Sequence, residues 1–350
     1  MKSLEQYRGR RVYVGMSGGV DSSVTAALLQ AAGAMVTGVF LKGWYPPGLP
    51  CTWSADRRDA MRAAAHLGLR FHTLDASAEY KQSVIDYLIA EYRAGRTPNP
   101  DIMCNREVKF GAFHRFAKAN GADYIATGHY VRAEHSDTGS RLLRGIDASK
   151  DQSYFLWNVP AAALEGAIFP LGSFVKKEVR SLAARFRLPN AAKKDSQGIC
   201  FLGSISVHDF LRSELGSTPG KALDAEGKEI GSHEGAVLYT LGERVALSSA
   251  VPGPWYVLAK DLSANTLTVS HERSLPEPPA DICIRESNWF SGSAPQGEVE
   301  AQYRYHGPRI IGCLDGDRFI PGSPLAEPIA RGQSLVLYRG DACLGGGIIA

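Results

Sequence analysis

The sequence predicts an α/β N-terminal domain with a parallel sheet, followed by a small central domain and a C-terminal β-barrel. Over the first two hundred residues, short apolar strand-like segments alternate with helix-like segments, which is typical of a parallel sheet covered by helices. After about residue 205, glycine, proline and short β-rich runs replace the helical patterns. The 350 residues are too many for one compact domain. We therefore expect domains at residues 1–205, 206–272 and 280–350, with a proline-rich linker at 276–279.

The expected elements follow from local residue patterns. Short apolar runs such as RVYVG predict buried strands, and alanine- and leucine-rich stretches that end at glycine predict helices. In chain order, we expect a strand at 11–15, a helix at 21–32, a strand at 34–41, a helix at 56–67 and strands at 70–74 and 122–128. In the later domains, we expect strands at 255–259, 266–270, 298–305 and 334–338.

Composition and charge exclude several classes of protein. The chain is 44% hydrophobic and 21% charged, as in globular rather than disordered proteins. No run approaches the ~18 apolar residues that cross a bilayer, and the N-terminus lacks a signal-peptide core, so we expect a cytoplasmic chain with no membrane partner. The net charge of +3 decides nothing about nucleic acid. The six cysteines form no C-x-x-C pair, which excludes a zinc ribbon, and we expect those without a chemical role to be buried small hydrophobes.

A glycine- and serine-rich loop lies between the first expected strand and the first expected helix. Its sequence is SGGVDSS, at residues 17–23. Two glycines allow a ligand to approach the backbone closely, and the helix start directs N–H groups and its positive dipole end toward the loop. The loop matches neither a P-loop kinase nor a dinucleotide fingerprint. We interpret it as a polyanion site, suited to pyrophosphate; the alternative is a turn with a polar helix cap.

Two cysteines stand in motifs that suggest chemistry. Cys104 follows Asn99-Pro100-Asp101 near the start of an expected helix, beside Arg106 and Lys109, and both the helix start and the cations favour a thiolate. Cys200 lies in the segment DSQGICF at 195–201, before a further glycine. A structural cysteine near a helix start, and a buried thiol between two apolar residues, are the alternatives.

These segments resemble known enzymes. The loop SGGVDSS resembles the pyrophosphate loop of the ATP pyrophosphatases, which have an adenine nucleotide alpha hydrolase-like fold and cleave ATP between the α- and β-phosphates to form adenylates. The whole chain is similar to the tRNA-specific 2-thiouridylases of the MnmA type. The matching segments are GMSGGVDSS at 15–23, NPDIMCN at 99–105, ATGHYVR at 126–132, KDQSYFL at 150–156, FPLGSFVKKEVR at 169–180, KDSQGICFLG at 194–203, YTLGERV at 239–245, GPWYV at 253–257 and CLGGGII at 343–349.

The resemblance implies a role for each matching position. Cys104 would be the nucleophile, Cys200 the persulfide carrier, and Asp101 a general base or a residue that orients the target base. The ATP-binding residues would be Gly15, Met16, Ser17, Gly18, Gly19, Val20, Asp21, Ser22, Leu41 and Gly128. The residues that contact the target uridine or the rest of the tRNA would be Asn99, Pro100, Asp101, His129, Lys150, Asp151, Gln152, Arg304, Tyr305 and Gln333.

The resemblance also implies an overall reaction. It is the ATP-dependent 2-thiolation of the wobble uridine, position 34, of tRNA, which makes the chain a tRNA-uridine 2-sulfurtransferase. The C2 oxygen would be adenylated, and a cysteine persulfide would supply the sulfur, giving 2-thiouridine, AMP and pyrophosphate. Mg²⁺ would accompany the ATP. The partners would be the anticodon loops of the tRNAs for Lys, Glu and Gln, and a cysteine desulfurase or relay protein as sulfur donor.

Two local features qualify the expected RNA contacts. Seven basic residues and one acid lie between Lys176 and Lys194, and such a patch can follow phosphates; a solvated helix face is the alternative. Relatives usually continue the YT-x-G-x-R motif with K-G-L-G, whereas Arg244 is followed here by VALSSA at 245–250. We therefore expect the RNA-contacting loop of the central domain, but not the catalytic centre, to differ.

Three other functions stay open on the residues alone. An adenylating ligase or amidotransferase would use the same loop and need neither Cys104 nor Cys200. An inert RNA-binding protein would not need the intact loop. Cys51, Cys104 and Cys200 could also hold an iron–sulfur cluster, although the absence of C-x-x-C makes us expect none.

Overall fold

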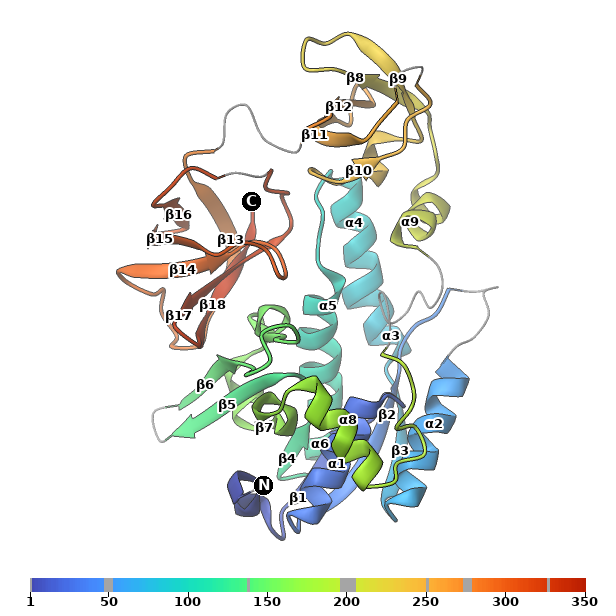
Figure 1. Ribbon diagram of the computed structural model, residues 1–350, viewed down its shortest axis with the longest axis vertical. Helices are drawn as coiled ribbons and strands as arrows, with labels where there is room; N and C mark the ends of the chain where they lie inside the picture. Colours follow the sequence, from blue (N-terminus) through green and yellow to red (C-terminus); the bar gives the residue numbers. More distant parts are fainter. Residues whose placement is uncertain are drawn as a thin grey trace.

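The computed structural model describes residues 2–46, 53–136, 139–195, 206–249, 252–272, 279–325 and 328–350. It contains a parallel sheet at the N-terminal end, a five-stranded central sheet and a closed six-stranded barrel (Figure 1). The predicted fold class is therefore confirmed. Among the described residues, no helix is both long and apolar enough to cross a bilayer.

The N-terminal sheet has the strand order β3-β2-β1-β4-β7, with all pairings parallel. Its strands are β1 (Arg11–Gly15), β2 (Met35–Lys42), β3 (Arg70–Asp75), β4 (Tyr124–Ala126) and β7 (Ala167–Ile168). Val14 of β1 pairs with Gly38 on one side and Ala126 on the other. Because the chain order reverses at β1, the crevice at the carboxyl ends of β1 and β4 is where such sheets bind ligands.

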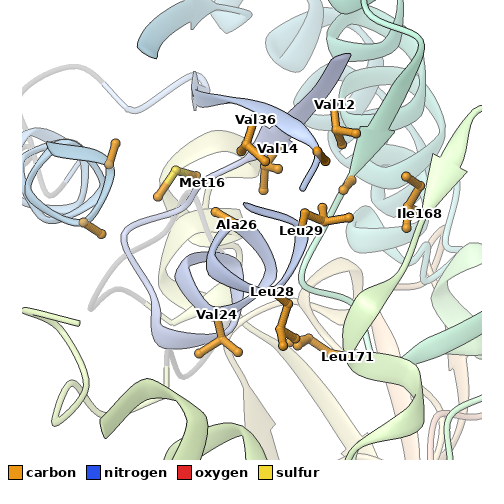
Figure 2. Close-up of a cluster of buried hydrophobic side chains, with 14 of the residues drawn as sticks. Val12, Val14, Met16, Val24, Ala26, Leu28, Leu29, Val36, Ile168 and Leu171 are labelled. Atoms are coloured by element: carbon orange, nitrogen blue, oxygen red, sulfur yellow. The ribbon is translucent and has the colours of Figure 1, made fainter. Parts of the chain in front are cut away.

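Helices α1 (Val20–Ala31), α2 (Trp53–His66) and α8 (Lys176–Arg185) pack around this sheet. Figure 2 shows Val14 and Val36 of the strands close to Ala26 and Leu29 of α1, in one hydrophobic cluster that also includes Leu171. Apolar residues on several sides of α1 are buried because α8 covers the side away from the sheet. This packing fixes the start of α1 against the end of β1.

Two longer helices lead away from the sheet toward the central domain (Figure 1). The first consists of α3 (Ser77–Tyr80), η2 (Lys81–Asp86) and α4 (Tyr87–Arg93), and the second of α5 (Pro100–Met103), η3 (Cys104–Ala112) and α6 (Phe113–Ala119). In each, the middle segment has the wider turns of a π-helix, a feature often found at functional sites. We did not predict the first helix, although Tyr80, Val84, Leu88 and Tyr92 give its sequence a four-residue apolar spacing.

The central domain joins one short helix to a small sheet. Its elements are α9 (Val207–Leu215), η6 (Ala236–Leu238), β8 (Gly220–Leu223), β9 (Glu229–His233), β10 (Arg244–Val245), β11 (Trp255–Asp261) and β12 (Thr266–Ser270). Phe210 and Leu211 of α9 share a hydrophobic cluster with Leu88 and Tyr92 of α4, so the domain is seated on that helix. The segment that departs from the family pattern closes the sheet, since Val245 pairs with Trp255 and Ser248 bridges to Ser232.

The C-terminal barrel closes through antiparallel pairing of its first and last strands. Its strands are β13 (Ile282–Trp289), β14 (Glu298–Gln302), β15 (Ile310–Asp315), β16 (Arg318–Pro321), β17 (Ser334–Arg339) and β18 (Ala342–Ile349). Closure pairs the edges that an open sheet would leave exposed.

A hairpin from the N-terminal part of the chain extends the barrel sheet. It consists of β5 (Val131–Ser136) and β6 (Gly139–Arg144), and Leu142 and Leu143 of β6 pair with Cys343 and Ala342 of β18. The packing continues in η4 (Ser153–Leu156), α7 (Ala161–Glu165) and η5 (Pro170–Ser173). Tyr154 and Trp157 lie in one cluster with Val336 and Tyr338 of the barrel. The N-terminal sheet and the C-terminal barrel therefore share one hydrophobic core. The predicted domain boundaries did not include this shared core.

Candidate active site

The loop after β1 is held by its own hydroxyls. The hydroxyl of Ser22 accepts from the Ser17 N–H at 3.2 Å and donates to the Gly19 carbonyl at 3.2 Å. The Ser23 hydroxyl donates to the same carbonyl at 3.0 Å. Gly18 has φ +79°, and a Cβ there would lie 2.3 Å from the Asp56 carbonyl oxygen of α2. Only glycine fits this position.

Asn190 holds the loop from the opposite side. Its buried Nδ2 lies 2.9 Å from the Gly18 carbonyl, 3.1 Å from the Gly19 carbonyl and 3.0 Å from the Ser23 hydroxyl. These contacts draw the loop carbonyls toward the protein. Helix α1 begins directly after them, and its first N–H groups point beyond its N-terminus, so the loop presents donors to an anion. No local sequence pattern indicated Asn190, which lies 171 residues from Gly19.

Asp21 stands in the first turn of α1 within a charged network. It accepts from the Tyr130 hydroxyl at 2.9 Å, and Lys176 Nζ lies 2.8 Å from both of its carboxylate oxygens. Lys176 also lies 2.9 Å from Asp195, which is paired with Arg180 as well and lies 3.5 Å from Lys150. Burial, followed by the charge of Asp21, raises the pKa of Tyr130 far above its usual value, so its hydroxyl stays a donor.

These ion pairs, and a further one, engage three of the seven basic residues in the predicted basic patch. Lys176 and Arg180 pair with carboxylates around the loop, and Lys193 lies 2.8 Å from Asp56 and 2.7 Å from Asp59 of α2. Because their charges are balanced within the fold, these three residues organise the loop and its surroundings. An RNA contact by the rest of the cluster stays a prediction.

The other predicted ATP-binding residues surround the same loop. A Cβ on Gly128, after β4, would lie 2.9 Å from the Ser22 nitrogen, so this glycine allows the two segments to meet. A Cβ on Gly15 would lie 3.7 Å from Leu41 Cδ1, which places the Leu41 side chain beside the end of β1. Met16 and Val20 are only 1% and 4% exposed and can offer a ligand little more than their backbone.

The predicted base-binding segment forms the start of the second long helix. The Asn99 side chain accepts from the N–H groups of Asp101 at 3.0 Å and Ile102 at 3.4 Å, with Pro100 in the first turn, as predicted for a helix start. Burial raises the pKa of the Asp101 carboxyl, and Lys109 opposes the shift. Cys104 is 4% exposed. Of the two predicted cations beside it, Arg106 pairs with Glu107 at 3.0 Å.

A chain of polar contacts joins this helix to β4. Lys109 donates to Asn105 at 2.9 Å and lies 3.5 Å from Nε2 of His129, whose Nδ1 is 2.7 Å from the Thr127 hydroxyl. Asn105 in turn donates to the Phe155 carbonyl at 2.9 Å. Burial, followed by the charge of Lys109, lowers the pKa of His129 well below its usual value, so the ring is neutral.

The segment Lys150-Asp151-Gln152 supports the surrounding backbone through hydrogen bonds. Asp151 accepts from the N–H of Gly145 at 3.0 Å and from the Ser153 hydroxyl at 2.9 Å, and Gln152 accepts from the Tyr130 N–H at 3.0 Å. Lys150 lies beside Asp195, as described above. Asp151 and Gln152 therefore have structural roles in this fold, and their contact with RNA stays a prediction.

Arg304, Tyr305 and Gln333 line two cavities at the barrel. Tyr305 packs on Phe155, with ring centroids 4.4 Å apart, and lines a cavity of about 480 Å³ together with Arg132, Arg144 and Arg309. Arg304 and Gln333 line a second cavity of about 340 Å³, against residues 240–243 of the central domain. Gln333 also donates to the Thr97 carbonyl at 2.7 Å, two residues before Asn99.

The five cysteines other than Cys104 divide into three groups. Cys200 and Cys51 lie outside the described residues. Our expectation that the cysteines without a chemical role are buried is right for Cys343, whose pKa burial raises to about 12. It is wrong for Cys283 and Cys313, which occupy outward positions of alternating barrel strands. Within the described parts of the chain, no three His, Cys, Asp or Glu side chains gather as metal ligands would.

Comparison with known proteins places this site in a family. A family model described as the tRNA methyl transferase HUP domain matches residues 10–204, and one described as the tRNA methyl transferase PRC-barrel domain matches residues 208–271. The curated tRNA-specific 2-thiouridylase MnmA of Shigella boydii serotype 4 (strain Sb227) is 44% identical over 357 residues, which covers 97% of this chain and 96% of that protein. The chain belongs to the MnmA family of tRNA-specific 2-thiouridylases. The relative of the same name from Escherichia coli (strain K12) matches with the same identity and coverage.

Other matches cover less of the chain. A model described as the aminomethyltransferase beta-barrel domain matches residues 323–349, within the barrel of this MnmA-family chain. Among solved structures, the NMN synthetase from Francisella tularensis is 17% identical, with a TM-score of 0.37, over 56% of this chain and 73% of that chain. The U34-tRNA thiolase NcsA from Methanococcus maripaludis with its [4Fe-4S] cluster is 16% identical, with a TM-score of 0.36, over 61% and 70%. Likeness at this level carries no functional conclusion.

Proposed function

We propose that this tRNA sulfurtransferase makes 2-thiouridine at wobble position 34 by adenylating the C2 oxygen of uracil and replacing it with persulfide sulfur. The placement of Leu41 is the observation that carries the proposal. Leu41 lies beside Gly15 at the loop and also packs against the hydrophobic cluster that contains Cys104. A nucleotide on the loop and a base beside Cys104 would therefore meet at one corner of the sheet.

The first step uses the loop to hold MgATP as substrate. The N–H groups at the start of α1 and the hydroxyls of Ser17 and Ser22 would bind the pyrophosphate part, with Leu41 and Gly128 beside the nucleoside. The C2 oxygen of uracil attacks the α-phosphorus, the bond to the β-phosphate oxygen breaks, and pyrophosphate leaves. The oxygen thereby becomes part of AMP, which is a much better leaving group.

The second step orients and activates the base. Asn99, Pro100 and Asp101 would contact a uridine that is unpaired or turned out of the anticodon loop. Burial raises the pKa of the Asp101 carboxyl, so this group accepts a proton more readily than an exposed carboxylate does. Neutral His129, held through Lys109 and Thr127, would contact the tRNA beside it.

The third step delivers sulfur from a persulfide on Cys200. Either its terminal sulfur attacks C2 and expels AMP, after which Cys104 attacks the Cys200 sulfur, or Cys104 attacks first and the released sulfide attacks C2. Both routes reduce the transferred sulfur by two electrons and oxidise the two thiols to a Cys104–Cys200 disulfide. A thiol reductant then reopens the disulfide. Because Cys104 is 4% exposed, its covering side chains must move during turnover.

The remaining assignments complete the proposal. Residues 1–205 would perform the chemistry in the cytoplasm, and residues 206–272 and 280–350 would bind tRNA. Lys150, Asp151 and Gln152, with Arg304, Tyr305 and Gln333, would contact the RNA, since arginine and tyrosine near cavities suit phosphates and bases. The tRNAs would be those for Lys, Glu and Gln, and a cysteine desulfurase or relay protein would load Cys200.

Single-turnover assays of the full chain with tRNA, ATP and a protein persulfide donor test this proposal. The wild type is expected to form one AMP and one pyrophosphate per 2-thiouridine. Cys200→Ser should lose persulfide loading but keep tRNA-dependent AMP formation, whereas Cys104→Ser should load sulfur and fail to transfer it. One of the two exposed barrel cysteines gives the control Cys313→Ser, which should match the wild type. ADP as the main product, or 2-thiouridine from Cys200→Ser without free sulfide, would contradict the proposal.

A further inference from the structure

The connection between α4 and α5, residues 94–99, is held by both later domains. Within it, Thr97 is only 8% exposed, although connections between helices normally lie at the surface. The Thr97 N–H donates to the Arg331 carbonyl at 2.7 Å, and the Thr97 carbonyl accepts from the Gln333 side chain at 2.7 Å. The Thr97 hydroxyl lies 3.1 Å from that of Thr240 in the central domain. All three polar groups of Thr97 therefore have partners in the later domains.

The barrel packs directly on this connection. In the turn before β17, Gly332 has φ +89°, and a Cβ there would lie 2.9 Å from the Thr97 nitrogen and 3.0 Å from the Arg96 Cβ. The turn is fixed to the last strand, because the Gly332 N–H donates to the Ile349 carbonyl at 2.8 Å and the Ile349 N–H donates to the Gln333 carbonyl at 2.8 Å. A side chain at the glycine position would push the connection away from the barrel.

Two prolines make the rest of the connection stiff. Residues 97–100 read Thr-Pro-Asn-Pro. Each proline fixes its own φ and restricts the residue before it to extended backbone, which Asn99 adopts with φ −106° and ψ 105°. The Asn99 side chain then caps the next helix through the N–H groups of Asp101 and Ile102. A displacement at Thr97 is therefore carried to Asn99, because the backbone between them has little freedom to absorb it.

We propose that Thr97 is a positioning residue, through which the barrel and the central domain place the base-binding residues 99–101. This inference rests on the proposed function, because it assumes that residues 99–101 contact the target uridine. Thr97 acts through Asn99 and does not itself touch the base. The predicted RNA contacts Arg304 and Gln333 line the cavity at the same junction. The barrel thus contributes to the rate of adenylation as well as to RNA binding.

Single-turnover AMP formation by the full chain, with MgATP and increasing tRNA, separates the rate constant from the affinity for tRNA. Gly332→Ala is expected to lower the rate constant at saturating tRNA by about 10-fold to 100-fold, the cost of misplacing a reacting group. The affinities for tRNA, by filter binding, and for MgATP, by calorimetry, should stay within about 3-fold of the wild type. Gly316→Ala is the matched control and should react like the wild type. Gly316 also lies in a barrel turn with a positive φ, +56°, but a Cβ there would meet nothing within 4 Å.

A second pair of variants tests Thr97 itself. Thr97→Val keeps the shape of the side chain but loses the hydroxyl contact with Thr240. It should slow AMP formation by about 2-fold to 10-fold, the range for one neutral hydrogen bond. Thr97→Ser keeps the hydroxyl and should recover the wild-type rate constant. If Gly332→Ala does not fold, this pair decides the assignment.

Two results would overturn the inference. A wild-type rate constant in Thr97→Val and in a folded Gly332→Ala protein would show that the connection does not place the base. Weaker tRNA binding with an unchanged rate constant at saturating tRNA would show that Thr97 only joins the domains that hold RNA. Either result in a chain whose wild type forms 2-thiouridine refutes the positioning role alone, whereas a wild type that forms none refutes the proposed function.

Discussion

Asp101 shows how one residue can combine local and tertiary influences. Its N–H is bonded by the Asn99 cap, so its backbone is fixed by the start of the helix. Its carboxyl is half-buried, and burial raises its pKa, with Lys109 opposing. A folded pKa above the unfolded value means that this group contributes less stability as pH rises past its unfolded pKa. At neutral pH the carboxylate therefore costs stability, which is typical of a residue kept for function.

Asp101→Asn is expected to lower thiolation at least about 100-fold, because the amide cannot accept the proton. The variant should unfold at pH 7 no more easily than the wild type, since the neutral side chain removes the cost of burying charge. Glu107→Gln, on the same helix and paired at the surface with Arg106, is the control and should retain activity. Thiolation kinetics and thermal unfolding check both points, and wild-type activity in Asp101→Asn would remove Asp101 from the mechanism.

At the scale of elements, the pyrophosphate loop depends on close packing between segments. Gly18 adopts φ +79°, and α2 lies so close that a Cβ would be 2.3 Å from the Asp56 carbonyl oxygen. Lys193 binds Asp56 and Asp59 at the same end of α2. The loop is therefore shaped by α2 and by the segment that contains Lys193, as well as by β1 and α1. Both α2 and this segment follow the loop in the chain.

Gly18→Ala should displace the loop from α2 and weaken ATP binding by about 10-fold or more, through backbone strain of about 1 kcal/mol together with the clash. Gly68→Ala is a matched control. Gly68 also has a positive φ, +67°, but a Cβ there would meet nothing within 4 Å. Both variants place alanine at a positive φ, but only Gly18→Ala brings a Cβ against α2 at the loop, so Gly68→Ala should keep wild-type ATP affinity by calorimetry. Equal affinities would mean that this contact does not shape the loop.

At the scale of the whole molecule, buried Glu91 links the first long helix to the barrel. Its carboxylate accepts from Arg96 at 2.7 Å and from Arg285 of β13 at 2.9 Å. The hydrogen bond from Arg96, opposed by burial and supported by both cations, lowers the pKa of Glu91. Together with the core shared by Tyr154 and Tyr338, this pair makes the barrel part of one folded unit. Removing residues 280–350 would expose that core, so RNA binding is better tested by substituting Arg304 or Tyr305.

Glu91→Gln should lower the free energy of unfolding at pH 7 by about 1–3 kcal/mol, since both arginines are about one-third exposed and partly screened. Because the folded pKa of Glu91 lies below its unfolded value, its contribution is present above the unfolded pKa and is lost as pH falls through the folded pKa. The variant should therefore lose less stability than the wild type between pH 5 and pH 3. Denaturant unfolding measures both effects, with exposed Glu134→Gln as the control. Equal acid sensitivity in the wild type and Glu91→Gln would disprove the link.

Local patterns in the sequence determined the elements that form within a few residues of their signals. The strand at 11–15, the helix that begins within SGGVDSS and the capped helix start at Asn99 all lie where they were expected, because propensity, capping and apolar spacing act over one or two turns. The loop and the cysteine motifs also indicated the family. The first long helix was missed although its spacing was visible, since no cap was identified before it.

Only the tertiary structure decided which distant groups meet. Lys176 reaches Asp21 across 155 positions, Asn190 reaches Gly18 across 172, and strands β5 and β6 extend a sheet whose other strands begin at Ile282. No local pattern specifies such pairs, because the chain order of the strands, the side that each helix covers and the closure of the barrel set them together. The sequence by itself therefore determined the loop, the capped helix and their chemistry, while the fold determined which lysine, asparagine and carboxylates surround them.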